Sequence, residues 1–285
     1  MKNNITKLKA LVFDKTFWQN TWIVPSVLFA ITTTFLSFIE IEWKDKLLYG
    51  LIIVSLLYIL ISLNRVYKLH SISLNIDGSE FEVTSGDIFQ QDSECYKVIA
   101  FNEFFDTLVD DNLISESSLN GQYILKKYPS NNDINELNRR ISNDPRLDKK
   151  ELDVYRKLGG NTTRYELGSI FKDKDYFLVA FSKFNEKNEA NLKLTEYAAC
   201  LLKFWGEVNT LYNRKTVVLP LLGSGITRHK DFNASNQQLL EILIWTFKIS
   251  KVKFREPSKV KILIHERQLG EINFYKLKEM EKIGI

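Results

Sequence analysis

The chain has 285 residues, of which 45% are hydrophobic and 26% are charged, with a formal net charge of +4. This supplies enough apolar material for one domain of ordinary size and a smaller second part. Only two cysteines and three histidines occur, which argues against a disulfide scaffold and offers no metal-ligand spacing, and no dense basic stripe with interleaved aromatic residues indicates nucleic acid.

The N-terminal part contains two long apolar segments. Residues 18–39 contain no charged side chain. A helix of about 22 residues would be roughly 33 Å long, close to the hydrocarbon thickness of a bilayer. The second uncharged run, residues 47–63, has about 17 residues and would need tilting partners or local thinning of the bilayer. The connection between them is short and charged. We therefore expect residues 1–68 to form an antiparallel transmembrane helical hairpin.

Basic residues flank the hairpin on one side. Lys15 follows three earlier lysines ahead of the first segment, and Arg65 and Lys68 follow the second, whereas the connection holds more acids than lysines. The positive-inside rule therefore places both flanks, and everything from residue 69 onward, in the cytoplasm. A cleaved signal peptide fits less well, because the apolar run is too long, starts too late and lacks a small-residue cleavage pattern.

The first segment is more polar than a simple anchor requires. Its hydroxyl groups either help the helices pack on copies of themselves or line a water path, or else they bond their own backbone in a plain hairpin anchor. The residues concerned are Ser26, Thr32, Thr33, Thr34 and Ser37, with Pro25 among them.

From residue 69 onward, short β-type runs alternate with helical patterns. Residues 71–76 and 80–84, on either side of Asp77-Gly78, predict a β-hairpin or two early strands. Apolar runs of the buried-strand kind are Tyr96–Phe101, Phe177–Phe181, Thr216–Leu221 and Val260–Ile264. Helical spacing and caps predict helices over Asp133–Ile141, Asp148–Leu158, Leu192–Leu211 and Ser235–Ser250. This order predicts one α/β three-layer domain over residues 69–285, with residues 129–150 as a surface excursion.

The loops that follow the predicted strands hold the candidate ligand-binding residues, since ligands bind beyond the carboxyl ends of strands in open α/β sheets. Asp87 follows the early hairpin, residues 102–107 follow the next strand, and Gly223-Ser224-Gly225 follows Leu221. The two glycines would let backbone N–H groups approach an anion, although such a pair is also common in ordinary tight turns. An acidic residue, an amide with aromatic neighbours and an N–H-rich loop together suit ADP-ribose.

These segments resemble a known family. Gly86-Asp87-Ile88 ahead of a Val-Ile-Ala-Phe-Asn strand, with Leu-Leu-Gly-Ser-Gly-Ile further on, resembles a macro domain. Residues 101–107, 114–121 and 168–170 are similar, more specifically, to the macro domain of Thoeris ThsA effectors that carry N-terminal transmembrane helices, over about residues 70–285. The resemblance implies a macro-domain-like three-layer α/β/α sandwich with a mixed sheet, preceded by an N-terminal two-helix transmembrane hairpin.

The resemblance also implies the ligand-binding residues. Asp87 would accept a hydrogen bond from the adenine amino group beside the Ile88 N–H, and Asn102 would lie on the ribose side. Loops around the rest of the ligand would be Ser118, Leu119, Asn120 and Gly121, and then Leu222, Gly223, Ser224, Gly225, Ile226 and Thr227 at the diphosphate.

Each of these residues also has a purely structural interpretation. Asp87 could cap a turn, Asn102 could bond its own backbone at the strand end, and Ser118 could cap a helix. Arg228 could add charge at the diphosphate or simply be solvated. The aromatic residues Phe104, Phe105 and Phe184 fit either the far end of the pocket or the core.

The family implies an effector in the inner membrane of a bacterium. A TIR-domain partner enzyme would consume NAD and make an ADP-ribose derivative, and binding of this diffusible signal would drive homo-oligomer assembly of the hairpins, damage to the lipid bilayer and cell death or growth arrest. We expect no catalytic residue, metal, cofactor or nucleic acid. Hydrolytic macro domains carry Asn-Ala-Ala-Asn and a glycine run in the first loop, whereas this chain has Asn102-Glu103-Phe104-Phe105. A membrane-anchored ADP-ribosyl hydrolase or ADP-ribose processing enzyme is the alternative.

Overall fold

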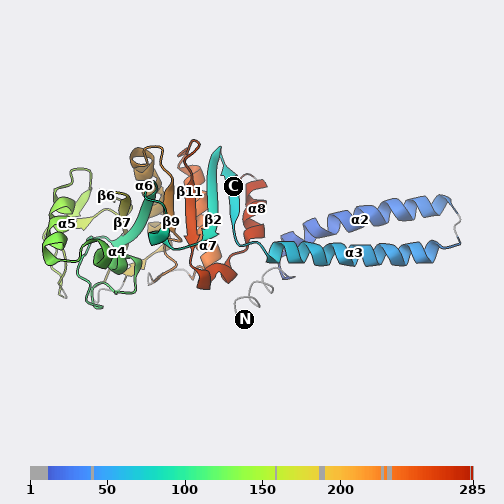
Figure 1. Cartoon of the computed structure of the whole chain (residues 1–285), viewed down its shortest axis with the longest axis horizontal. Coiled ribbons are helices and arrows are strands. Elements are labelled where there is room, and N and C mark those ends of the chain that lie inside the picture. Colours follow the sequence, from blue (N-terminus) through green and yellow to red (C-terminus); the bar gives the residue numbers. More distant parts are fainter. Residues whose placement is uncertain are drawn as a thin grey trace.

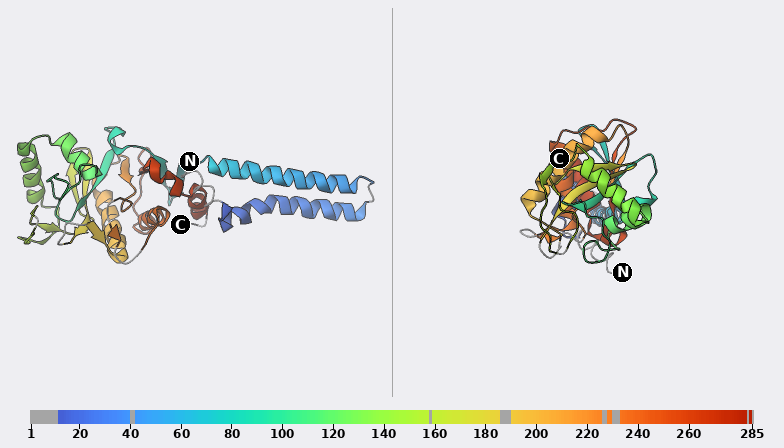
Figure 2. Two further views of the ribbon diagram at one scale, coloured as in Figure 1. Left: turned by 90° about the horizontal axis from the view of Figure 1, so that it is seen from below. Right: turned by 90° about the vertical axis from the view of Figure 1, so that its left-hand side faces the viewer.

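A computed structural model shows an α/β domain and an elongated helical hairpin that projects from it (Figure 1). The structure describes residues 12–39, 42–157, 159–185, 190–225, 228–229 (backbone), 233–282 and 284. The hairpin consists of α2 (Lys15–Phe38) and α3 (Lys44–Tyr67), which lie side by side in Figure 1 and in the left view of Figure 2. Both are long and apolar enough to cross a membrane, and most of their surface is exposed.

Two hydroxyl groups of α2 are satisfied within the helix itself. Thr33 Oγ1 donates to the Phe29 carbonyl at 2.8 Å, and Ser37 Oγ donates to the Thr34 carbonyl at 2.6 Å. In α3, Ser55 Oγ donates in the same way to the Leu51 carbonyl at 2.8 Å. The hydroxyls of Thr33 and Ser37 are therefore bonded to the backbone of their own helix, as the second interpretation expects.

The domain is built on a mixed sheet of nine strands among the described residues, in the order β1-β2-β11-β9-β3-β7-β8-β10, with β6 paired to β7. Neighbours from β2 to β7 along this order run parallel, whereas β1, β6 and β8 pair antiparallel with β2, β7 and β7. The strands are β1 (Ile72–Ile76), β2 (Ser79–Ser85), β3 (Tyr96–Asn102), β6 (Ile170–Asp173), β7 (Tyr176–Phe184), β8 (Ala190–Leu192), β9 (Val217–Pro220), β10 (Arg228–His229) and β11 (Val260–Ile264). β4 (Lys149–Glu151) and β5 (Arg164–Tyr165) form a separate pair.

Helices cover both faces of this sheet. Along β7, Phe177 and Val179 belong to one apolar cluster and Leu178 and Ala180 to the other, as expected when successive strand residues point to opposite faces. The first cluster includes residues of α6 (Leu194–Leu211), α7 (Asn236–Ile249) and α8 (Phe274–Lys282), and the second includes residues of α4 (Leu119–Lys127) and α5 (Asn131–Asn143). The predicted three-layer α/β/α arrangement is confirmed.

One buried carboxylate organises the α4/α5 side of the sheet. Asp173, at the end of β6, accepts hydrogen bonds from the hydroxyls of Tyr123 and Tyr128 and pairs with Arg140 at 2.7 Å. Burial alone would raise the pKa of Asp173, but these hydrogen bonds and the nearby charge of Arg140 hold it below its usual value. This ion pair ties α5 to the sheet.

The predicted elements are largely confirmed, with one clear error. Each of the four apolar runs lies on a strand, and β11 matches its predicted range. Ser235 caps α7 and accepts from the Gln238 N–H, as expected. The helix predicted over residues 148–158 is wrong: residues 149–151 form β4, and Leu152 and Tyr155 are 61% and 88% exposed, so the apparent apolar periodicity had no core to pack against. Leu158 lies outside the described residues.

Candidate functional site

A cavity of about 570 Å³ opens where three neighbouring parallel strands, β9, β3 and β7, reach their carboxyl ends. It is the position at which open α/β sheets bind ligands. The lining combines strand ends, the loop before α4 and the loop after β9. Its residues are Ala100, Phe101, Asn102, Asp111, Asn112, Leu113, Ile114, Ser115, Ser117, Ser118, Leu119, Asn120, Phe181, Ser182, Phe184, Ala190, Pro220, Leu221, Leu222, Gly223, Ser224 and Gly225.

The Gly-Ser-Gly loop is held from several sides. The Leu222 carbonyl accepts from the Tyr197 hydroxyl at 3.0 Å, and the Ser224 carbonyl accepts from Gln268 Nε2 at 3.0 Å. The Leu221 carbonyl accepts from the backbone N–H and the hydroxyl of Ser224 itself. These bonds fix the backbone of the loop, and the Ser224 N–H is among the groups that they use.

The two glycines of this loop differ in their physical role. Gly223 has a φ of +86°, a left-handed conformation in which other residues are strained. Gly225 does not, and a Cβ built on it meets no atom within 4 Å in the described part of the chain. Gly223 therefore shapes the turn, whereas Gly225 leaves space open beside the cavity.

Asn102 lies at the cavity wall, but its side chain is already bonded to the protein. Its Oδ1 accepts from the N–H groups of Phe104 and Asp106 at 3.0 and 3.2 Å, and its Nδ2 donates to Asp106 Oδ2 at 2.8 Å. The structural interpretation of Asn102, a strand-end residue that fixes its own turn, thus describes its polar contacts. Asn102 is itself buried, and its contact with ribose stays a prediction.

Beneath this turn lies a buried ion pair that the sequence did not reveal. Asp106 is fully buried and accepts from Arg156 Nη1 at 2.7 Å and from the Asn161 N–H at 2.7 Å. Burial raises the pKa of Asp106 above its usual value, and the positive charge of Arg156 opposes this shift. Gly160 is required here, because a Cβ would come within 2.4 Å of Arg156 Nη1. The pair supports the turn rather than reaching the cavity.

The loop before α4 combines structural and unsatisfied groups. Ser118 caps α4 by accepting from the Gly121 N–H at 3.0 Å, so its capping interpretation is confirmed. Gly121 does not line the cavity, and a Cβ there would lie 2.2 Å from the Ser115 carbonyl oxygen, which requires glycine. Asn120 Oδ1 is buried at the cavity and has no hydrogen-bond partner among the residues that the structure describes. A buried oxygen of this kind could accept a hydrogen bond from a donor group of a ligand.

Asp87 and Ile88 are not among the residues that line the cavity. Asp87 Oδ1 accepts from the Phe89 N–H at 2.9 Å and caps the 3₁₀-helix η1 (Ile88–Gln90), as its structural interpretation expected. Ile88 is buried in the cluster on the α4/α5 side. Asp87 itself is exposed and lies outside the cavity lining. Its contact with the adenine amino group stays a prediction.

The remaining candidates differ in where the structure places them. Phe184 lines the cavity, whereas Phe104 and Phe105 are core residues. Ile226 and Thr227 lie outside the described residues, and only the backbone of Arg228 is described, in β10.

Over the described part of the chain, no group of three or more histidine, cysteine, aspartate or glutamate side chains could hold a metal ion.

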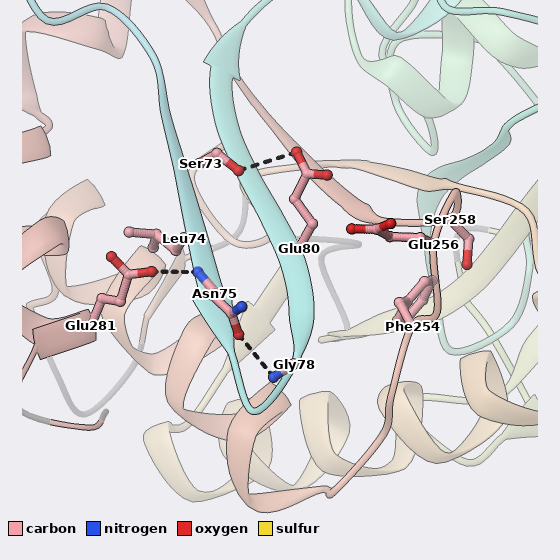
Figure 3. A pocket seen from close by; sticks show the side chains of 9 residues that line it. All are labelled: Ser73, Leu74, Asn75, Gly78, Glu80, Phe254, Glu256, Ser258 and Glu281. Carbon is pink, nitrogen blue, oxygen red and sulfur yellow. Dashed lines mark hydrogen bonds between the residues drawn. The ribbon is translucent and has the colours of Figure 1, made fainter.

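A second, smaller cavity of about 270 Å³ lies beside the β1–β2 hairpin (Figure 3). Its polar groups are largely paired with one another: Ser73 bonds Glu80, the Gly78 N–H bonds Asn75 Oδ1, and the Asn75 N–H bonds Glu281. It lies against an edge of the sheet, away from the carboxyl ends of β3 and β9. We assign it no function.

Comparison with known proteins agrees with this architecture. The family model described as "Thoeris protein ThsA, Macro domain" matches residues 81–265. The Thoeris protein ThsA of Bacillus amyloliquefaciens (strain Y2) is 52% identical over 283 residues, which cover 98% of this chain and 94% of that protein.

Solved macrodomain structures from Oceanobacillus iheyensis are more distant. A mutant form is 14% identical with a TM-score of 0.45, covering 75% of this chain and 100% of that one. A form with ADP is 12% identical with a TM-score of 0.46, covering 75% and 97%. On the family model and the 52% identical relative, the chain belongs to the Thoeris ThsA family, and its α/β domain is a macro domain.

Proposed function

We propose that the protein is a membrane-anchored effector of a bacterial Thoeris antiphage defence system, whose macro domain binds an ADP-ribose derivative made by a TIR-domain enzyme from NAD. The observation that carries the proposal is the cavity at the ends of β9, β3 and β7, bordered by the Gly-Ser-Gly loop. Family membership supports a role in Thoeris defence.

The cavity offers different chemistry along its length. The loop at Gly223 and Gly225 suits a diphosphate, because glycines lack a side chain and let the backbone come close to the phosphate oxygens. The buried, unpartnered Asn120 Oδ1 suits a hydroxyl or amine donor of the ligand. Asp87 would accept from the adenine amino group through Oδ2, since Oδ1 caps η1. A ligand held in this way would extend from the cavity toward η1.

In this proposal the hairpin spans the inner membrane, with both flanks and the macro domain cytoplasmic. Asn20 contacts α8 of the macro domain, so the membrane-embedded part of α2 begins at about Thr21 instead of Trp18. The rest of α2 is about 27 Å long, still sufficient to cross the hydrocarbon. The exposed apolar faces of α2 and α3 would contact lipid or other hairpins.

Activation would shift an equilibrium between hairpin assemblies. A ligand shifts such an equilibrium only by its differential affinity for the two states, and a preference of about 100-fold corresponds to roughly 2.7 kcal/mol. This is enough to switch a poised homo-oligomer, whose assembly would then damage the membrane.

Calorimetric titration of the full chain in lipid nanodiscs, with ADP-ribose and with the product of a TIR-domain enzyme, tests the sensor. The ligand is then recovered and its mass determined. Stoichiometric binding of the TIR product with unchanged mass supports the proposal. Conversion of the ligand would instead establish the alternative, an ADP-ribosyl hydrolase or ADP-ribose processing enzyme, and absence of binding would refute both.

A further inference from the structure

Helix α8 joins the macro domain to the first membrane helix through a polar contact. Asn20 Nδ2, on α2, donates to the Tyr275 hydroxyl and to Glu279 Oε2, each at 2.9 Å. The ring of Phe17 packs edge-on against Tyr275 at 5.6 Å between centroids and is almost completely buried. α8 lies between the sheet and the hairpin in both side views (Figures 1 and 2).

At the same junction, the caps of two helices are bonded to each other. Asp14 Oδ1 caps α2 by accepting from the Phe17 N–H at 2.9 Å, and its Oδ2 accepts from Asn273 Nδ2 at 2.6 Å. Asn273 Oδ1 in turn accepts from the Lys276 N–H in the first turn of α8 at 3.1 Å. A shift of one helix N-terminus therefore strains the cap of the other.

The segment just before α8 reaches the cavity. It is the 3₁₀-helix η2 (Glu266–Glu271), from which Gln268 Nε2 donates to the Ser224 carbonyl of the Gly-Ser-Gly loop at 3.0 Å. Two bonds to α7 steady the connection: Asn236 Nδ2 donates to Glu271 Oε2 at 2.7 Å, and the Asn273 N–H donates to Gln237 Oε1 at 2.8 Å. Four residues of chain, 269–272, thus separate the cavity contact at Gln268 from the hairpin contact at Asn273.

The covalent connection between hairpin and domain follows a different path. α3 ends at Tyr67 and leads into β1, which is an edge strand. β2 and β11 separate this strand from β9, after which the Gly-Ser-Gly loop follows. The contact through α8 is therefore the shorter route between cavity and membrane helix.

We propose that η2 and α8 couple the ligand cavity to the hairpin, so that a movement of the Ser224 carbonyl changes the Asp14–Asn273 contact and the position of α2. This inference rests on the proposed function, because it names the route by which that site would act on the membrane helices. Coupling of this kind is reciprocal, so loosening the hairpin contact must also loosen the loop.

Hydrogen exchange of the full chain in nanodiscs, without ligand, tests the coupling first. Asp14→Asn keeps an oxygen for the α2 cap but weakens the bond to Asn273, and Gln268→Ala removes the bond to Ser224. We expect each variant to speed exchange at the opposite end, residues 222–225 for the first and the first turn of α8 for the second, by about tenfold. Asn20→Ala serves as a second hairpin-side variant.

Two control variants and an internal reference make the result decisive. Lys278→Ala changes an exposed residue of α8, and Thr33→Ala changes a hydroxyl bonded only within α2, so neither should alter exchange at the loop. Unchanged protection of β7 amides shows that a variant is folded. Changes confined to the mutated end in all three coupling variants would overturn the proposal.

Titration with ADP-ribose as the probe then separates the two proposals. Asp14→Asn and Gln268→Ala should change the ADP-ribose affinity in the same direction by several-fold, while Lys278→Ala leaves it unchanged. Binding that is equal in all variants would overturn the coupling and leave the sensor intact. If wild-type protein binds neither ADP-ribose nor the TIR product, the proposed function fails, while the ligand-free exchange still decides the coupling.

Discussion

Gly225→Trp is the sharpest perturbation of the cavity, because the structure predicts that it blocks the ligand without harming the fold. Among the residues that the structure describes, a Cβ at residue 225 meets no atom within 4 Å, and its φ is not in the left-handed region that only glycine adopts readily. Replacing a glycine in an accessible conformation also restricts the unfolded chain, which contributes about 0.4–1 kcal/mol of stability. We therefore expect the thermal unfolding temperature to stay the same or rise slightly.

Ligand affinity should respond in the opposite way. The indole ring would occupy the space beside the Gly-Ser-Gly loop that the diphosphate needs, and the nucleotide would have to displace it. We expect affinity for the TIR product to fall at least about 100-fold, or about 2.7 kcal/mol, in calorimetric titration of the full chain. Retained binding by a folded Gly225→Trp variant would refute the assignment of this loop.

A matched control is available on the same domain. Gly206, on the exposed side of α6, also has no described atom within 4 Å of a built Cβ. Gly206→Trp therefore adds the same ring at a site away from the cavity lining, and it should leave both folding and affinity unchanged.

The remaining predictions concern groups that hold the cavity in shape. Gly121→Ala should lower stability by about 2 kcal/mol or more, because its Cβ would overlap the Ser115 carbonyl oxygen; an unchanged thermal unfolding temperature would contradict this. Tyr197→Phe should cost about 1–2 kcal/mol and weaken nucleotide binding severalfold, since the Leu222 carbonyl loses its buried donor; calorimetry and thermal unfolding check both effects. Asp173→Asn should cost about 3 kcal/mol at pH 7. Because the folded-state pKa of Asp173 is lowered, the stability it contributes is present above its unfolded pKa of about 3.9 and is lost as pH falls further. The stability difference between wild type and this variant should therefore shrink below about pH 4 in denaturant titrations, and a difference independent of pH would contradict the ion-pair explanation.

Six strands, β1, β2, β3, β7, β9 and β11, were predictable because each carries a local signal, whereas the short strands β4, β5, β6, β8 and β10 were not predicted. Val260–Ile264 is apolar at nearly every position, and the structure shows why: it lies in the middle of the sheet, with helices on both faces. The two helices with long apolar stripes were found for the same reason. Periodicity failed over residues 148–158, where Leu152 and Tyr155 have helical spacing but point to solvent. α4 and α8 were missed because they are short and carry several polar residues.

The candidate site could be predicted only where its residues are close in sequence. The Gly-Ser-Gly loop, Ser118 and Asn120 were found from turn chemistry and family resemblance, and they do line one cavity. The Asp106–Asn161 bond joins residues 55 positions apart, so no local pattern could reveal it. The same holds for the contact between Asp14 and Asn273, which lie at opposite ends of the chain.

Dye release from liposomes that carry the full chain tests the central claim most directly. The account predicts release when the product of a TIR-domain enzyme is added on the macro-domain side, no release without it, and none from the Gly225→Trp variant at any concentration that saturates wild type. Release that is independent of the nucleotide, or equal release from Gly225→Trp, would contradict the claim that this cavity controls the membrane hairpin.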